Sequence, residues 1–378
     1  MKSADVLIVG AGLAGLTCAI HLLKSGYPVL LLEKNPFPQH KVCGEYVSNE
    51  VLPYLNWLGI DPFAQKATKL SKLQVSVENG KTINCKLPLG GFGLSRALFD
   101  QLLYQKFLEL GGSFLQETVC DICFDQDHFN VKSNQNVYKT RIVVGAYGKR
   151  TGLDHKLNRV FIHKTSPWLA VKAHYTGAFD EELVALHNFK GGYCGISTIE
   201  NNLINVCYLT SYEIFKKYRN TEEHQRQVLF GNKHLKHFFN HHAMQFSVPL
   251  TISQIHFGAK ETVKDHVLMI GDTAGMIHPL CGNGMAMAIH SAKISAELLL
   301  RHFKEKNFNR IQMEDEYNRL WHQHFAKRLG FGKFLSALLL RPGLSSFASS
   351  LISSVPGLLP PLLKRTHGKL LINRYHVS

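Results

Sequence analysis

The first segment of the chain alternates between apolar runs and one helical pattern. Residues 6–9 and 29–32 are short apolar runs that predict buried strands, and residues 16–24 place apolar side chains at helical spacing. A helix between two buried strands predicts one βαβ unit with parallel strands. The pattern therefore predicts an α/β fold that begins with a parallel sheet.

Three glycines lie in the turn between the first strand and the helix. Gly10, Gly12 and Gly15 have G-x-G-x-x-G spacing. The first permits a tight turn, the second lets the backbone approach a pyrophosphate, and the third allows close helix packing. Glu33 ends the second strand, where a carboxylate can accept hydrogen bonds from ribose hydroxyls. A purely structural turn is the alternative, but these features in register predict an adenine dinucleotide site at the helix N-terminus.

A second glycine-rich segment follows an apolar run at residues 267–270. Gly271 and Asp272 end that predicted strand, a loop of Gly, Pro and Asn follows, and residues 285–300 predict a long helix. A carboxylate at a strand end and a glycine-rich loop before a helix can bind sugar hydroxyls and an anion. A tight turn is again the alternative. Two such segments in one chain predict that both contact one large cofactor.

The middle of the chain predicts a second sheet. Residues 70–77 and 81–87 alternate around a turn at residues 78–80, which predicts a hairpin, and residues 168–209 are rich in strands. Between them Ser95 caps a helix that runs to residue 110. Arg96 stands in its first turn, where the helix dipole disfavours a cation. A nearby anion would resolve that conflict; a solvated surface position is the alternative.

No metal site is predicted. Cys120 and Cys123 form a C-x-x-C pattern, but residues three apart on a strand face opposite sides, and no second pair accompanies them. Four histidines between residues 234 and 242 have no acid or cysteine beside them. Both groups are therefore interpreted as structural.

Composition describes an ordinary globular protein with a strong basic excess. The 378 residues are 45% hydrophobic and 19% charged, with a formal net charge of +15, so one elaborated domain or two joined domains are expected. The sequence shows no nucleic-acid module and no basic run interleaved with aromatics, so no nucleic acid is expected. Eight scattered cysteines and the lack of a signal-peptide pattern predict a cytoplasmic setting.

The basic excess is concentrated near the C-terminus. After Glu316 the last 62 residues contain nine Lys or Arg and no acid. Residues 342–363 are uncharged, but four prolines and six serines disfavour a spanning helix. The pattern predicts short apolar helices in peripheral contact with the inner face of an anionic membrane. A helical cap on the core is the alternative.

Together these motifs resemble FAD-dependent oxidoreductases of the p-hydroxybenzoate hydroxylase fold, and within them the geranylgeranyl reductase-like branch. The resemblance covers residues 1 to about 305. It implies a Rossmann-like FAD-binding domain, an interleaved substrate domain on a mixed β-sheet, and a helical C-terminal tail. The implied FAD-binding domain comprises residues 1–70, 91–155 and 251–305. The substrate domain comprises residues 71–90 and 156–250, and the tail residues 306–378.

The resemblance also assigns site residues. Arg96 would neutralise the FAD phosphates, Asp272 would bind ribityl or ribose hydroxyls, and residues 282–285 would approach the pyrophosphate and the flavin. The implied cofactor-binding residues are Gly10, Gly12, Leu13, Ala14, Gly15, Glu33, Lys34, Gly44, Arg96, Val119, Gly271, Asp272, Gly282, Asn283, Gly284 and Met285. Cys43 and Glu45 lie in the segment that resembles the cysteine-glycine stretch near the flavin, and are the catalytic candidates. A half-buried thiol near a turn is the alternative for Cys43.

One departure from the family pattern concerns the electron donor. Tyr147 replaces the Asp of an Asp-Gly pair credited with contacts to both FAD and NAD(P)H. NADPH or NADH is therefore one alternative for the donor, and a separate electron-donor protein is the other. Flavin-dependent halogenases share the fold but carry a W-x-W-x-I-P segment, which the widely separated Trp57, Trp168 and Trp321 do not form.

The predicted function is reduction of carbon–carbon double bonds in a hydrophobic, lipid-like or polyketide-like substrate. The flavin would supply the hydride, and a protein acid or water the proton. The first alternative is a monooxygenase that hydroxylates an aromatic or polyketide substrate through a flavin C4a-hydroperoxide. A flavin-binding module without catalytic activity is the third hypothesis.

Overall fold

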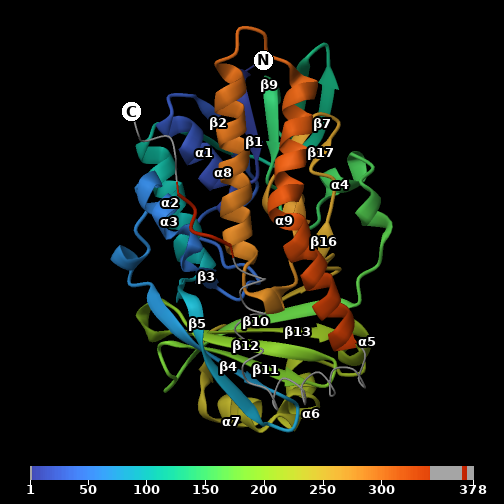
Figure 1. Ribbon diagram of the computed structural model, residues 1–378. Helices are drawn as coiled ribbons and strands as arrows, with labels where there is room; N and C mark the ends of the chain where they lie inside the picture. The colour runs from blue at the N-terminus through green and yellow to red at the C-terminus, as the bar shows by residue number, and fades with distance from the viewer. Residues whose placement is uncertain (1, 341–367, 373–378) are drawn as a thin grey trace.

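The computed structural model describes residues 2–340 and 368–372 (Figure 1). Its first sheet has a parallel centre, and β7 (Val119–Asp125) and β8 (His128–Ser133) extend it as antiparallel strands beside β9. The main strands, in spatial order, are β17 (Val263–Lys264), β18 (Val267–Met269), β9 (Val137–Gly145), β1 (Lys2–Val9), β2 (Val29–Glu33) and β6 (Ser113–Gln116). The predicted βαβ unit is present as β1, α1 (Leu13–Lys24) and β2.

The parallel register brings four strand ends together. Val9 of β1 pairs with Leu32 of β2 and Gly145 of β9, and Gly145 pairs with Met269 of β18. Because these strands are parallel, their carboxyl ends meet at one edge of the sheet, where ligands of α/β folds bind. Both predicted glycine-rich segments start at this edge.

The second sheet is mostly antiparallel, with one parallel pair between β11 and β4. The predicted hairpin is confirmed as β4 and β5, which are longer than expected. The strands, in spatial order, are β14 (Ala243–Met244), β10 (Trp168–Thr176), β13 (Ile204–Ser211), β12 (Gly192–Thr198), β11 (Leu183–Phe189), β4 (Thr68–Ser76), β5 (Thr82–Gly93) and β3 (Tyr46–Ser48), with β15 (Leu250–Ser253) beside β10. The predicted domain boundaries stay a prediction.

Helices cover both sheets. In Figure 1 the second sheet lies across the lower ends of α8 and α9, while α6 and α7 lie on its far side. A small third sheet pairs β16 (Gly258–Ala259) with β19 (Gly275–Met276). The other helices are α2 (Leu52–Leu58), α3 (Arg96–Glu109), α4 (Gly152–Lys156), α5 (Tyr212–Phe215), α6 (Thr221–Gln227), α7 (Lys233–His241), α8 (Gly284–Phe303) and α9 (Arg310–Leu340).

Strand β10 shows how the second sheet is buried on both faces. Leu169, Val171 and Ala173 belong to the core under α6 and α7, whereas Trp168 and Ala170 belong to a different cluster. Since side chains alternate along a strand, Lys172 and His174 share the face of Trp168. Two polar residues are thus buried on the side that faces the first sheet.

Helix α9 packs as part of the core. Tyr317, Trp321 and Phe325 are buried in the main hydrophobic cluster, and the Tyr317 hydroxyl donates to the Met269 carbonyl at 2.5 Å. Within the described residues, no helix is both long and apolar enough to cross a membrane. The uncharged stretch 342–363 lies outside the described residues, so its predicted membrane contact stays a prediction.

Strand β7 departs from strict alternation. The sequence pattern predicts Cys120 and Cys123 on opposite faces of a strand, and both are exposed on β7. The register of β7 against β8 shifts between Val119 and Asp121, which marks an irregularity at Cys120. A bulge adds one residue to a strand and so breaks its alternation. In residues 2–340 and 368–372, no cluster of His, Cys, Asp and Glu is arranged to hold a metal ion.

Candidate functional site

The turn from β1 to α1 is packed too tightly for side chains at two of its glycines. A Cβ at Gly10 would lie 2.5 Å from the Ala146 carbonyl oxygen, and Gly10 has φ +101°. A Cβ at Gly15 would lie 1.9 Å from the Gly10 carbonyl oxygen. Both positions therefore require glycine, because the helix and β9 approach the turn backbone directly.

Gly12 has a different environment, because its open side faces two cations. A Cβ there would lie 3.6 Å from Arg96 Nη2 and 3.8 Å from Lys41 Nζ. Gly12 is also the N-cap of α1, and no side chain caps this end of the helix. The first-turn N–H groups, the positive dipole end and two cations thus converge, which suits a pyrophosphate. Lys41 was missed from the sequence, since nothing local marks it.

Asp100 holds both cations in place. Arg96 donates to Asp100 through Nε at 2.9 Å and Nη2 at 2.8 Å, and Lys41 Nζ donates at 2.9 Å. Burial opposes ionisation of Asp100, but Arg96 and Lys41 outweigh it and lower its pKa. Two cations on one carboxylate leave a surplus positive charge beside Gly12. Arg96 in the first turn of α3 calls for a nearby anion, and Asp100 is part of the answer. The remaining positive charge is available to a phosphate.

Glu33 lies beside the same turn. Its Oε2 accepts the Ala11 N–H at 2.9 Å, and its Oε1 accepts the Asn35 N–H at 3.0 Å. The half-buried carboxylate is thereby fixed at the end of β2, next to the glycine turn. This is the place from which a carboxylate can bind ribose hydroxyls.

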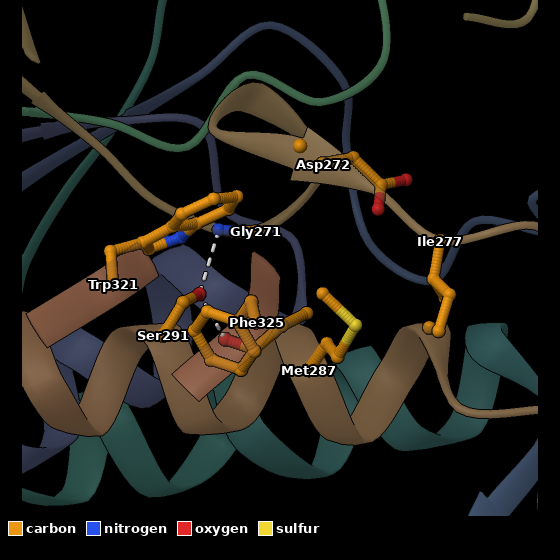
Figure 2. Close-up of a pocket in the computed structure, with 10 residues that line it drawn as sticks. Gly271, Asp272, Ile277, Met287, Ser291, Trp321 and Phe325 are labelled. Atoms are coloured by element: carbon orange, nitrogen blue, oxygen red, sulfur yellow. Dashed lines mark hydrogen bonds between the residues drawn. The ribbon is translucent and has the colours of Figure 1, made fainter. Parts of the chain in front are cut away.

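The second glycine-rich segment is anchored to α8. The Gly271 N–H donates to Ser291 Oγ at 2.8 Å, and in Figure 2 the Asp272 side chain extends away from Ser291. Trp321 and Phe325 of α9 help to line a small cavity of about 10 Å³ behind these residues. Such a cavity has room for about one water. Helix α9 therefore packs against the Gly271-Asp272 turn on the side of this cavity.

Comparison with known proteins bears on this arrangement. Residues 5–44 match the family FAD dependent oxidoreductase, and residues 233–326 match the family Squalene epoxidase. The chain is 22% identical to a digeranylgeranylglycerophospholipid reductase of Methanococcus vannielii, over 87% of this chain and 84% of that protein. It is 23% identical to conditioned medium factor receptor 1 of Dictyostelium discoideum, over 92% of this chain and 73% of that protein.

The fold agrees with these matches. The solved structure of the flavin-dependent brominase Bmp2 superimposes with a TM-score of 0.78, at 19% identity, over 97% of this chain and 93% of that one. The chain is an FAD-dependent oxidoreductase. The predicted fold class, with its FAD-binding and mixed-sheet parts, is confirmed. The individual residue assignments stay predictions, which the geometry of the oxidoreductase can support or weaken.

The remaining predicted FAD residues of the oxidoreductase have varied environments. Leu13, Ala14 and Met285 are buried, Gly44 is exposed, and Lys34 follows β2. Val119 begins β7 and packs against the main core. Gly282 has φ +63°, and Asn283 and Gly284 lead into α8, with Asn283 Nδ2 donating to Glu50 Oε2 at 3.3 Å.

Lys260 is hydrogen-bonded to the backbone of the second glycine-rich segment. Its Nζ donates to the Lys149 carbonyl at 2.6 Å and to the Asp272 carbonyl at 2.8 Å, and lies 4.2 Å from the Phe161 ring centre. Burial lowers the pKa of Lys260 to about 8, against an opposing effect of Asp272. The residue thus ties the Gly271-Asp272 turn to the loop after β9. Sequence reasoning missed it as well.

Glu45 of the oxidoreductase is fully buried between the two sheets, at φ +53°. Its Oε1 accepts from Lys172 Nζ and from the Arg96 N–H, the latter at 2.7 Å, and its Oε2 pairs with His174 Nε2 at 2.7 Å. Burial opposes ionisation, but His174 and Lys172 outweigh it and lower the pKa of Glu45. An ionised carboxylate held by three donors favours a positioning role over proton donation. In the sequence, Lys172 and His174 alternate with apolar residues along a predicted strand. This pattern was the only local sign that two polar side chains share one face of the sheet.

Cys43 lies at the same junction. Its thiol is half-buried, and its carbonyl accepts from Asn205 Nδ2 of β13 at 3.3 Å. Cys207 also lies on β13, and burial together with the nearby Cys43 raises the Cys207 pKa to about 12. Segment 41–45 is therefore held against the second sheet. The catalytic role of Cys43 stays a prediction.

A buried apolar cluster on the second sheet lies beside this junction. Trp168, Tyr193, Leu209 and Met276 form a buried cluster with Ala170 and Ile255, and Val42 packs against it. Tyr147, which replaces the family Asp, instead donates its hydroxyl to Met269 Sδ at 3.4 Å, and packs on the main core.

Proposed function

We propose that this oxidoreductase reduces carbon–carbon double bonds of a hydrophobic, lipid-like substrate. The apolar cluster around Trp168 and Tyr193 carries the proposal, because Val42 joins it directly to Cys43. Apolar side chains of this kind suit a hydrocarbon chain and would exclude water from the reaction. The likeness to a reductase whose name specifies a digeranylgeranyl lipid, over most of both chains, supports the same reading.

Different residues would bind the cofactor, position segment 41–45 and deliver the proton. FAD supplies the hydride chemistry when bound. Gly12, Lys41 and Arg96 would hold its pyrophosphate, and Asp272 its sugar hydroxyls. Glu45 would position segment 41–45 through Lys172 and His174. Cys43 Sγ, half-buried at the junction, would hold the proton for the second alkene carbon.

The alternative function is oxygen insertion. It is favoured by the match of residues 233–326 to squalene epoxidase, which includes Asp272 and the loop before α8. The same apolar cluster would then hold the substrate while water is excluded. Fold likeness to a brominase leaves the choice open, since one fold hosts several reactions.

The reaction can be decided by its product. The holoenzyme would be reduced without oxygen, by NADPH and separately by dithionite, and incubated with digeranylgeranylglycerophospholipid. A product that gains two hydrogens per double bond supports the reductase. A product formed only with oxygen, and heavier by one oxygen atom, supports the monooxygenase. Reduction by dithionite but not by NADPH would support a separate electron-donor protein.

Cys43 can be tested in the same assay. We expect Cys43→Ser to lower turnover by about 10²-fold, as for loss of a general acid. Cys120→Ser changes an exposed cysteine on β7 and should leave turnover unchanged. Equal rates in both variants would remove Cys43 from the proton path.

We also propose that the C-terminal tail brings the enzyme to an anionic membrane surface. Its basic residues and the uncharged stretch 342–363 support the proposal. A chain that ends at Leu340 should sediment less with vesicles of anionic lipid than the full chain. Equal sedimentation would favour a structural cap.

A further inference from the structure

A buried histidine lies in the loop that leads to α8. His278 is 1% exposed and immediately precedes Pro279. Its Nδ1 accepts the Leu280 N–H at 3.4 Å, which assigns the ring proton to Nε2. Nε2 has no hydrogen-bond partner among residues 2–340 and 368–372. The ring is therefore a buried donor whose acceptor is missing.

The surroundings keep this histidine neutral. Its ring centre lies 4.6 Å from that of Phe257, 5.7 Å from Trp168 and 6.0 Å from Tyr193. Burial lowers the pKa of His278 to about 3, so the imidazole is uncharged at neutral pH. A buried N–H without an acceptor costs about 1–3 kcal/mol. A buried polar group without a partner calls for an explanation, such as a catalytic role or a bound water or ion.

The position of the ring indicates which ligand this is. Trp168 and Tyr193 lie on β10 and β12, and both belong to the apolar cluster proposed to hold the substrate. The cationic side chains that would hold FAD phosphates, Lys41 and Arg96, gather instead around Gly12 and Asp100. The donor thus lies on the substrate side of the oxidoreductase.

We propose that His278 Nε2–H donates a hydrogen bond to a carbonyl or hydroxyl oxygen of the substrate. The substrate class is then an otherwise apolar molecule that carries one oxygen acceptor within the aromatic cluster. This inference rests on the proposed function, because it uses the same apolar surface. It makes His278 a specificity-determining residue, which selects the oxygenated compound over the pure hydrocarbon.

A flavin carbonyl could offer the same acceptor chemistry, so the test separates the two sources. Oxidised holoenzyme would be titrated with 2-acetylnaphthalene and with 2-isopropylnaphthalene, which have similar shapes but differ in the carbonyl oxygen. Binding would be measured by calorimetry, with the flavin spectrum and FAD affinity recorded for each ligand-free variant. Binding needs no turnover, so the result stands even if the enzyme fails to reduce alkenes.

We expect the wild type to prefer the ketone by about 2- to 12-fold, the range of one neutral hydrogen bond. His278→Gln keeps an N–H donor and should keep the preference. His278→Leu and His278→Phe should bind both probes equally, with unchanged FAD affinity and spectrum; the second provides a ring if the first fails to fold. His256→Leu is the control, because His256 packs on Phe161 outside the cluster.

Two results would overturn the proposal. Equal or undetectable binding of the two probes by the wild type would show that no donor serves the ligand. A ketone preference that persists in both apolar variants would show that another group provides it. If FAD affinity and the flavin spectrum change in those variants while the preference persists, the acceptor is the flavin.

Discussion

At the scale of single residues, buried charges on unlike elements hold the site together. Glu45 joins the N-terminus of α3 to β10 through Arg96, Lys172 and His174. Lys260 joins the Gly271-Asp272 turn to the loop after β9. Burying each of these charges costs free energy, and the hydrogen-bonded or charged partners offset that cost.

Glu45→Gln should destabilise the protein strongly. The change leaves Lys172 buried without its counter-charge, and loss of one partner of a buried pair costs about 3–5 kcal/mol. Urea unfolding would measure the free energy of unfolding. Glu109→Gln, which breaks the exposed pair with Lys106, should cost at most about 1 kcal/mol. Similar losses in the two variants would contradict a central role for Glu45.

Lys260 should make stability rise with pH above neutrality. Its folded-state pKa is about 8, below the ordinary lysine pKa of 10.5, so the folded state binds fewer protons between these two pH values. Stability contributed by this group therefore increases as pH rises from about 8 toward 10.5. In Lys260→Met that increase should be smaller, as measured by unfolding free energy at several pH values. An identical pH dependence in variant and wild type would place the titration elsewhere.

At the scale of elements, the β1–α1 unit has an uncapped helix end, which is where we expect the cofactor's pyrophosphate. The helix begins at Leu13 without a side-chain cap, and the cations of Lys41 and Arg96 lie over Gly12. The helix end, the turn and the cations come from three segments, and together they would bind one anion.

Gly12→Val should abolish FAD binding, because its side chain would fill the space between the turn and the two cations. The flavin absorbance of protein after gel filtration would measure the loss. Gly231→Val is the control, since Gly231 is exposed and a Cβ there would meet no atom within 4 Å. A fully loaded Gly12→Val protein would refute the site.

At the scale of the whole molecule, one carboxylate connects distant parts of the chain to the cofactor loop. Glu50 accepts from the Gly368 N–H at 2.5 Å, from Asn283 Nδ2 at 3.3 Å and from Arg328 Nη1 at 3.4 Å. The Leu371 N–H donates to its carbonyl at 2.7 Å. Described residues near the C-terminus are thereby fastened beside the start of α8.

Glu50→Gln should weaken the hydrogen bonds that join residues 368–372, Arg328 and Asn283. Hydrogen bonds to a charged group are worth about 1.5–3 kcal/mol, and we expect a loss of that size together with faster FAD release. Unfolding in urea and the rate of FAD dissociation would measure both effects. Glu297→Gln breaks a pair with Lys293 within α8 and should leave FAD release unchanged. Unchanged FAD release in Glu50→Gln would limit Glu50 to a structural role.

Elements whose signals are local could be predicted from the amino-acid sequence. The βαβ unit, the glycine turn, the β4–β5 hairpin and helix α8 each depend on residues close together in the chain, so periodicity and turn chemistry suffice to predict them. The irregularity at Cys120 in β7 was not predicted. A bulge depends on pairing with the next strand rather than on local spacing.

Which charged side chains contact each other depends on the packing of distant segments. Lys41 and Asp100 are 59 positions apart, and Glu45 is 127 positions from Lys172 and 129 from His174. Partners at such distances are chosen by sheet register and by burial, which no local pattern records. The glycine turns could therefore be predicted from sequence, whereas the contacts of Lys41, Lys172, Lys260 and His278 depend on how the distant segments pack together.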